Sequence, residues 1–384
     1  MEKRDLKQLG ADITVTEIKQ QPKLWKEALE NYLANKKEMT NYLSAISNQH
    51  KKIRIIFTGA GTSAYVGDTV VPYLKGKVDE KAWELLSIPT TDLVSNPYDY
   101  FNESIPTLLI SFARSGNSPE SIAAIELGQQ IVKDFYQLTI TCAKDGQLAQ
   151  RTASDKKNLL FLMPEDSNDK GFAMTGSYTC MTLSALLIFD PVTVEEKEKI
   201  VQTLISMGEE VIEKEEEIQR VIDLDFNRVI YLGSGSLAGM TREAGLKLLE
   251  LTAGKVAMLF DSSLGFRHGP KSFVNNQTLI FVFTSNHEYT RKYDLDILNE
   301  VKNDQIAAHV CSLTVTSKEG FNGATFSFAE VGSPIPDAYL ALPYVMFAQT
   351  FSVMAAIKVK NKPDTPSPTG TVNRVVKGVT IHSY

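Results

Sequence analysis

The sequence has little of what marks several common classes of protein, and each shortage excludes something. Basic residues number 40 against 46 acidic ones, and the formal charge of −6 argues against nucleic acid as the main partner, because binding a phosphate backbone needs a basic surface. The five histidines are scattered, so a metal centre built on clustered histidine is not expected. Cys142, Cys180 and Cys311 form no metal or disulfide pattern, which fits a reducing cytoplasm.

Long apolar runs and targeting signals are also scarce. The N-terminus is charged with no apolar segment behind it, so we expect no signal peptide. Apolar stretches are interrupted well before about 18 residues, so we expect no membrane span and no membrane partner. A hydrophobic content of 43% can nevertheless form a sizeable core. These observations predict a cytoplasmic protein, and its length suggests two or three domains at about 150 residues each.

Helical and strand patterns alternate along most of the chain. Residues 14–49 are predicted to form two helices broken near Pro22. From residue 53, short apolar strands alternate with helical segments, and after a charged helical stretch at 191–223 the alternation begins again at residue 228. This alternation predicts an α/β protein with parallel sheets covered on both faces, in two doubly wound, flavodoxin-like domains of three αβα layers.

The predicted organisation has four segments: an N-terminal helical segment 1–49, a first α/β domain 50–200, a second α/β domain 201–358, and a C-terminal tail 359–384. The two α/β domains align on their first glycine turns, Thr58–Ser63 and Leu232–Leu237, which indicates an internal repeat at the scale of a domain.

The first glycine turn, Gly59-Ala60-Gly61-Thr62-Ser63, lies between an apolar strand and a helix. Glycine lets the backbone bend sharply and approach a ligand. The N–H groups at the start of the following helix then point at that ligand, and the helix dipole favours an anion. With two hydroxyl side chains added, this turn is predicted to bind a phosphate.

A second turn of the same kind, Arg114-Ser115-Gly116-Asn117-Ser118, follows the apolar strand 104–112. In a doubly wound sheet, ligands lie beyond the carboxyl ends of the strands, so two such turns can converge on one phosphate. The hydroxyls of Ser63, Ser115 and Ser118 are the expected donors. The alternative is that these polar residues only cap the helix that begins at Pro119.

A dinucleotide is the rival ligand for the glycine turns. Gly59-x-Gly61-x-x-Ala64 and Gly233-x-Gly235-x-x-Ala238 both match the loose dinucleotide fingerprint. That fingerprint needs an acidic residue at the end of the next strand to hold a ribose. The strand after the first turn ends at Ser87-Ile88-Pro89, with Asp92 beyond it, whereas the one after the second ends near Asp261, which is better placed but lies amid other candidates. The Ser-Gly-Asn-Ser turn itself suits a phosphate monoester better than a pyrophosphate.

Groups suited to proton transfer occur in the second α/β domain. Lys247 and Glu250 are three residues apart and lie on one face of a predicted helix, where a base beside a cation suits proton transfer at a sugar carbon. His268 follows in Arg267-His268-Gly269-Pro270, and imidazole exchanges a proton near neutral pH. The alternatives are a solvated ion pair and a histidine that only caps a turn.

These motifs together resemble those of double SIS (sugar isomerase) domain proteins, including the isomerase half of glucosamine-6-phosphate synthase. The chain is most similar to the galactosamine-6-phosphate deaminase/isomerase family, also called tagatose-6-phosphate ketose/aldose isomerases, over about residues 40–384. The motifs that carry the resemblance are Gly59–Ser63, Arg114–Ser118, Ala173-Met174-Thr175-Gly176-Ser177, Lys247-Leu248-Leu249-Glu250, Arg267–Pro270 and Asn373-Arg374-Val375-Val376-Lys377-Gly378-Val379-Thr380.

The resemblance implies roles for individual residues. Glu250 is implied to move the proton between C1 and C2, Lys247 to assist at the C1 oxygen, and His268 to open the ring from a neighbouring subunit. Lys377 is implied to form an imine with a ketose phosphate, on a tail that could close as a lid. The residues implied to hold the sugar phosphate are Gly61, Thr62, Ser63, Arg114, Ser115, Asn117, Ser118 and Thr175.

The chain also departs from the synthase. Arg114 and Ser118 replace a glutamine and a threonine, and the interval from Glu250 to His268 is two residues longer. We expect no amidotransferase domain, and the resemblance then implies that ammonia is released from an amino sugar and not added.

The expected enzyme converts galactosamine 6-phosphate to tagatose 6-phosphate and ammonia without a metal or organic cofactor. It is expected to be a homodimer or a dimer of dimers with the active site near the subunit interface. The alternatives are an aldose–ketose isomerase acting on a non-amino hexose 6-phosphate and a non-catalytic, sugar-phosphate-sensing regulator.

Overall fold

The computed structural model describes residues 3–152, 157–315, 320–329, 335–376 and 378–384 of the chain. These residues form two compact units. The first unit comprises Lys23–Asp169, Gly176–Lys197 and Val372–Tyr384, and the second unit comprises Met1–Pro22, Lys170–Thr175 and Glu198–Thr371. Below, each element is assigned to the unit that holds most of its residues, and each unit is described by itself.

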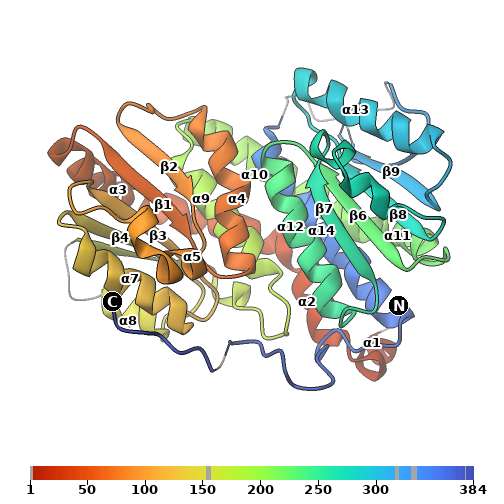
Figure 1. Cartoon of the computed structure of the whole chain (residues 1–384), viewed down its shortest axis with the longest axis horizontal. Coiled ribbons are helices and arrows are strands. Elements are labelled where there is room, and N and C mark those ends of the chain that lie inside the picture. Colours follow the sequence, from red (N-terminus) through yellow and green to blue (C-terminus); the bar gives the residue numbers. More distant parts are fainter. Residues whose placement is uncertain (1–2, 153–156, 316–319, 330–334, 377) are drawn as a thin grey trace. The chain divides into compact units, whose positions relative to one another are not determined.

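The first unit is built on five parallel strands (Figure 1). Its strands are β1 (Ile53–Thr58), β2 (Trp83–Ser87), β3 (Thr107–Ala113), β4 (Phe135–Thr141) and β5 (Asn158–Leu162). Its helices are α3 (Gln21–Gln49), α4 (Thr62–Lys75), α5 (Thr90–Ser95), α6 (Pro97–Tyr100), α7 (Pro119–Ile131), α8 (Gln147–Thr152), the 3-10 turn η1 (Glu165–Ser167) and α9 (Gly176–Phe189).

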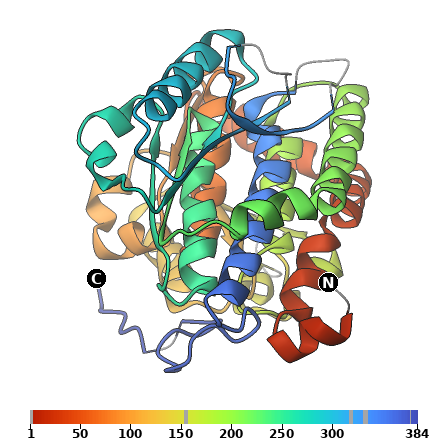
Figure 2. The ribbon, with the colours of Figure 1, turned by 90° about the vertical axis from the view of Figure 1, so that its right-hand side faces the viewer.

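The second unit is built on a second five-stranded parallel sheet (Figures 1 and 2). Its strands are β6 (Arg228–Gly233), β7 (Ala257–Ser262), β8 (Thr278–Phe283), β9 (His309–Thr314) and β10 (Ala324–Ser327). Its helices are α1 (Lys3–Leu9), α2 (Asp12–Lys19), α10 (Val194–Glu213), α11 (Glu215–Ile222), α12 (Ser236–Leu251), α13 (Glu288–Asn303) and α14 (Asp337–Lys358), with the 3-10 turns η2 (Gly265–Arg267) and η3 (Pro270–Phe273).

Both sheets have the same strand order. The first runs β2-β1-β3-β4-β5, and the second, read from its other edge, runs β7-β6-β8-β9-β10. In each, the first strand therefore lies between the second and the third, which is the flavodoxin-like order and places a switch point between the first and third strands. The predicted fold class is confirmed.

The fully buried strands are the ones that the sequence predicts most clearly. Every residue of β3 and of β8 is buried, because helices cover both faces of a parallel sheet, and their sequences are almost continuously apolar. In the first unit α4 packs with α9 and α5 with α7, and in the second α12 packs with α14. The strand β7 lies at an edge with no fully buried residue, so the sequence indicated only where it ends.

A few elements differ from the sequence-based expectation. The sequence predicts a helix over Met240–Leu251, but in the structure this helix begins one turn earlier, at Ser236, directly after Gly235 in a positive-φ conformation. The strand expected from residue 104 begins at Thr107, just after Pro106. The helix α13 was not expected, because charged residues interrupt its apolar positions.

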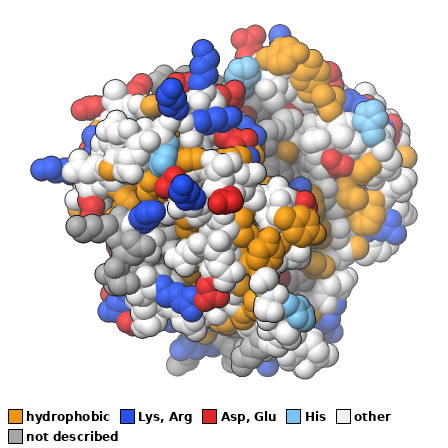
Figure 3. Space-filling view, turned by 60° about the vertical axis from the view of Figure 1, so that its left-hand side comes forward, with side chains coloured by type: hydrophobic (Ala, Val, Ile, Leu, Met, Phe, Trp, Pro, Cys, Tyr) orange, Lys and Arg blue, Asp and Glu red, His pale blue; other side chains and the backbone are white. Residues whose placement is uncertain are grey.

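The helix α14 is long and apolar enough to cross a membrane by length and composition. However, 89% of its most apolar 18-residue window is buried, as in the central helix of a soluble protein. On the face drawn in Figure 3, lysine and arginine side chains lie among acidic ones and form no continuous basic surface.

Candidate active site

The glycine turn after β1 has the backbone geometry of a ligand-binding loop. Gly61 is the N-cap of α4 with φ 56° and ψ −127°, a conformation that side chains disfavour. A Cβ atom at Gly59 would lie 2.5 Å from the carbonyl carbon of Ser63, so the turn closes only with glycine there. Thr62 and Ser63 then form the first turn of α4, and both are buried.

Two buried hydroxyls beside this turn have no partner within the described part of the chain. They are Oγ1 of Thr58, at the end of β1, and Oγ1 of Thr90, at the start of α5. The N–H of Thr90 donates to the Gly59 carbonyl at 2.8 Å, so Thr90 lies directly against the glycine turn. Buried hydroxyls are usually hydrogen-bonded, so these two, beside a helix N-terminus, are candidate contacts for a ligand. The sequence analysis overlooked both, although each is a hydroxyl residue at or just after a strand end.

The second turn lies after β3. Gly116 has φ 66°, and the Asn117 side-chain oxygen accepts a hydrogen bond from the N–H of Gln147 at 3.0 Å. Ser118 occupies the N-cap position of α7 but makes no side-chain capping bond. Its hydroxyl is instead 2.6 Å from that of Ser121. The capping alternative therefore does not describe Ser118.

A pocket of about 460 Å³ opens beside this second turn. Ser115 and Asn117 line it together with two cationic side chains, Lys144 and Arg374. Thr62, Ser63 and Ser118 are not among its lining residues. Two of the predicted phosphate-binding residues thus share a cation-bearing pocket within the first unit.

Arg374 fastens the C-terminal segment to this pocket. Its guanidinium donates to the carbonyl of Asp169, through Nε at 3.1 Å and through Nη2, and to the Asn168 side chain at 3.4 Å. Its own carbonyl accepts a hydrogen bond from Nη2 of the buried Arg114 at 2.8 Å. Arg374 belongs to one of the motifs that carry the family resemblance, but no role was predicted for it from the sequence. The lysine that was singled out in that motif, Lys377, lies outside the described residues.

The pocket also contains a thiol. Burial raises the pKa of Cys142 to about 12, while the Ser167 hydroxyl, 3.4 Å from its sulfur, opposes the rise. Cys142 is therefore protonated at neutral pH and is unsuited to act as a nucleophile.

In the second unit, α12 carries a lysine between two carboxylates. The Lys247 ammonium is 2.6 Å from Glu250 and 3.4 Å from Glu243, one helical turn away on either side. Lys247 and Glu243 are fully buried, whereas 23% of the Glu250 side chain is exposed. The alternative of a solvated ion pair is thus wrong. Glu250 is the member of this trio that a substrate can reach, and Glu243 is a partner that the sequence analysis missed.

His268 lies in the loop between η2 and η3, next to Gly269 with φ 123°. The loop is fixed on both sides of the histidine, because Arg267 and Lys271 each contact Glu300 at 2.6 Å. The imidazole itself is exposed and makes no hydrogen bond or ion pair within the described ranges.

Thr175, the last predicted binding residue, is fully buried just before α9. The N–H groups of the next two residues, Gly176 and Ser177, donate to the Asp169 carboxylate at 3.1 and 3.0 Å.

Comparison with known proteins places this geometry in a family. The SIS domain family matches residues 224–359. A D-galactosamine-6-phosphate deaminase, AgaS, from Escherichia coli is 42% identical over 380 residues, which are 97% of this chain and 96% of the relative. The chain belongs to the AgaS family of SIS-domain proteins.

Solved structures agree with this AgaS assignment. A candidate tagatose-6-phosphate ketose/aldose isomerase from Clostridium novyi NT has a TM-score of 0.92 at 41% identity, over 99% of this chain and 97% of its own. The tagatose-6-phosphate ketose/aldose isomerase from Escherichia coli has a TM-score of 0.86 at 40% identity, over 97% of both chains. The family expected from the motifs is thereby confirmed.

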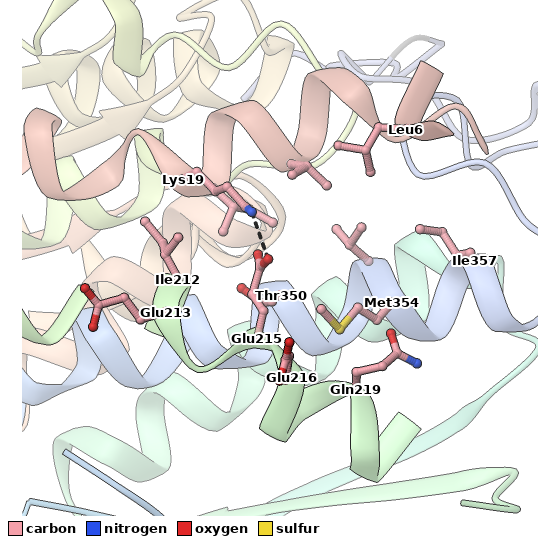
Figure 4. A pocket seen from close by; sticks show the side chains of 13 residues that line it. Leu6, Lys19, Ile212, Glu213, Glu215, Glu216, Gln219, Thr350, Met354 and Ile357 are labelled. Atoms are coloured by element: carbon pink, nitrogen blue, oxygen red, sulfur yellow. Dashed lines mark hydrogen bonds and ion pairs between the residues drawn. The ribbon is translucent and has the colours of Figure 1, made fainter. Parts of the chain in front are cut away.

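A further pocket, in the second unit, holds none of the AgaS site residues predicted from the sequence. It has about 370 Å³, lies between α1, α2, α11 and α14, and has mainly aliphatic walls (Figure 4). An ion pair of 2.8 Å between Lys19 and Glu215 crosses it. Without hydroxyl or amide donors grouped at a glycine turn, it is a poor match for a sugar phosphate.

Proposed function

We propose that this protein is a D-galactosamine-6-phosphate deaminase/isomerase, which forms tagatose 6-phosphate and releases ammonia. The observation that carries the proposal is the full-length likeness to an AgaS deaminase, at 42% identity. The buried hydroxyls and helix N-terminus after β1, and the partly exposed base beside a buried cation on α12, supply the two kinds of group that this chemistry needs.

The substrate phosphate is held mainly by residues of the first unit in this proposal. Thr62, Ser63, Ser115 and Ser118 supply hydroxyls, and the N–H groups at the start of α4 supply further donors. Gly61 allows the backbone to approach the ligand. Arg114 contributes a positive charge, and Asn117 and Thr175 are the remaining proposed contacts.

Proton transfer is assigned to Glu250. After the ring opens, the carboxylate removes the proton from C2 and returns it to C1, and the amine on C2 becomes an imine that water hydrolyses to the ketose and ammonia. The Lys247 ammonium, 2.6 Å from the carboxylate, is suited to stabilise negative charge that develops on the C1 oxygen. His268 is proposed to open the ring, and Lys377 to line the site.

The exposed, unpartnered imidazole of His268 supports a shared active site in a cytoplasmic homodimer, or a dimer of such dimers. In this arrangement His268 serves the neighbouring subunit. Mixing inactive His268→Ala and Glu250→Gln chains should therefore restore part of the activity. If verified mixed dimers show no recovery, the histidine does not act across an interface.

An ammonia-release assay tests the function itself. Galactosamine 6-phosphate should yield ammonia and ketose 6-phosphate in equal amounts, and glucosamine and N-acetylgalactosamine 6-phosphates serve as comparison substrates. The second candidate function, plain aldose–ketose isomerisation, is favoured by the names of the two structural relatives. Ketose formed from a non-amino hexose 6-phosphate, with no ammonia from any amino sugar, would establish that alternative.

A further inference from the structure

The second unit contains a fully buried carboxylate at the carboxyl end of its sheet. Asp294, on α13, accepts three hydrogen bonds: from the hydroxyl of Ser234 at 2.6 Å, from that of Ser263 at 2.5 Å, and from the N–H of Ser285 at 2.9 Å. The three donors come from the loops that follow β6, β7 and β8. One side chain therefore gathers the three loops at the switch point of this sheet.

These loops correspond to those of the phosphate turn in the first unit. Gly235 has φ 56° and ψ −124°, within a few degrees of Gly61. The N–H of Ser263 donates to the Gly233 carbonyl at 2.9 Å, as that of Thr90 donates to Gly59 at 2.8 Å. The backbone of a phosphate turn is thus present in both sheets.

The hydroxyls beside the two turns differ in their hydrogen-bond partners. The buried Thr90 hydroxyl has no partner in the described part of the first unit, whereas the Ser263 hydroxyl at the matching place donates to Asp294. Ser234 adds a second hydroxyl where the first turn has Ala60. Buried donors need an acceptor, and hydrogen bonds to a carboxylate are among the stronger ones. In the second sheet the chain itself provides that acceptor.

We propose that Asp294 is a resident anion, which occupies in the second sheet the place that a substrate phosphate takes in the first. It engages the Ser234 hydroxyl of the second turn together with one donor from each of the two neighbouring loops, and by its own charge it repels another anion. It thereby limits each chain to one phosphate site. The last step rests on the proposed function, since that function supplies the phosphate of the first turn.

A neighbouring carboxylate offers a matched control. Asp337, at the first position of α14, accepts hydrogen bonds from the Ser285 hydroxyl at 2.5 Å and from the N–H of Asn286 at 2.7 Å. Like Asp294 it is hydrogen-bonded to the β8 loop, but within the described residues it accepts no hydrogen bond from the glycine turn. Removing Asp337 should leave the second turn occupied.

The experiment counts inorganic phosphate bound per chain by equilibrium dialysis of the full-length protein, in a buffer without other oxyanions. We expect one phosphate in the wild type, two in Asp294→Ala and one in Asp337→Ala. A folded Asp294→Ala that binds no more phosphate than the wild type overturns the proposal, as does an equal gain in Asp337→Ala. If the wild type binds none and Asp294→Ala binds one, the proposed phosphate site of the first unit fails while this inference stands.

Folding of the variant is a second readout. If Asp294→Ala folds only when phosphate is present, the anion has replaced the carboxylate and the proposal is supported. Asp294→Ser, which keeps a small hydroxyl near Ser234 and Ser263, is the fallback for the count. If neither variant folds at any phosphate concentration, Asp294 is a structural residue and the proposal is wrong.

Discussion

The two sheets of this protein have a glycine turn of the same backbone geometry, but the buried hydroxyls beside the two turns have different hydrogen-bond partners. After β1 and after β6, a glycine at φ 56° starts a helix, and the loop after the next strand donates an N–H to the first glycine of the turn. In the first unit the adjoining buried hydroxyls of Thr58 and Thr90 lack partners among the described residues. In the second, the hydroxyls converge on Asp294.

This difference shows how a duplicated scaffold can divide its tasks. A turn whose donors are left unsatisfied is prepared to bind a ligand, whereas one satisfied by its own chain only holds loops together. The helix after the second turn, α12, carries Lys247 between Glu243 and Glu250. In the equivalent helix of the first unit, α4, the positions that match Glu243 and Lys247 are Thr69 and Tyr73, and the position that matches Glu250 is Gly76, just after the helix ends.

The largest expected effect separates chemistry from binding. Glu250→Gln removes the proposed base but keeps its volume, so kcat should fall by about 10²–10⁴-fold. The KM for galactosamine 6-phosphate should change little, because the phosphate donors belong to other residues. Glu216→Gln, at an exposed carboxylate of α11, is the control and should behave as the wild type. Steady-state kinetics that show equal turnover in Glu250→Gln would exclude it as the base.

Matched hydroxyls in the two turns give the next largest effect. Thr62→Ala removes a hydroxyl that is proposed to contact the phosphate, and hydrogen bonds to charged groups contribute about 1.5–3 kcal/mol, so KM should rise by roughly 10–100-fold. Ser236→Ala changes the residue at the same place in the second turn, where Asp294 occupies the site. It should leave KM unchanged. Equal rises in KM for both variants would mean that the two turns do not differ in function.

The glycines of the two turns should matter equally for stability but unequally for activity. Gly61→Ala and Gly235→Ala each place a side chain at φ 56°, which we expect to reduce the free energy of unfolding by about 1–3 kcal/mol. Nothing lies within 4 Å of a Cβ at either position, so the loss comes from the backbone and not from a clash. Only Gly61→Ala should also raise KM. Denaturant unfolding and kinetics of both variants check this, and a raised KM in Gly235→Ala alone would reverse the assignment.

How far the sequence reaches can be judged from these same residues. Periodicity and glycine turns predicted both sheets, because fully buried strands such as β3 and β8 are written as continuous apolar runs. Motif resemblance then identified the family. The sequence could not show that the Thr90 hydroxyl lacks a partner among the described residues. Nor could it show that Asp294 reaches Ser234, since residues 60 positions apart meet only through the fold. Their residue types are ordinary for loops and helices, and only their three-dimensional surroundings make them informative.

The smallest expected effect concerns the titration of the resident carboxylate. Burial raises the pKa of Asp294 above its ordinary value, and the Asp337 carboxylate adds to the rise, while the donors Ser234, Ser263 and Ser285 oppose it. A carboxyl group with a raised pKa in the folded state binds its proton more tightly there than in the unfolded chain. Its contribution to stability is therefore greatest below about pH 4 and is lost as the pH rises through the folded pKa.

Asp294→Asn removes this titration while keeping the size of the side chain. The free energy of unfolding of the wild type, minus that of Asp294→Asn, should fall as the pH rises from about 4 to 7, because only the wild type must hold a desolvated charge. Denaturant unfolding of both proteins across this range measures the difference. Asp296→Asn, two residues along α13 and exposed, should show no such trend against the wild type. If the difference for Asp294→Asn does not change with pH, the carboxylate ionises in the folded protein as easily as in the unfolded chain. The contrast between the two turns would then rest on hydrogen bonding alone.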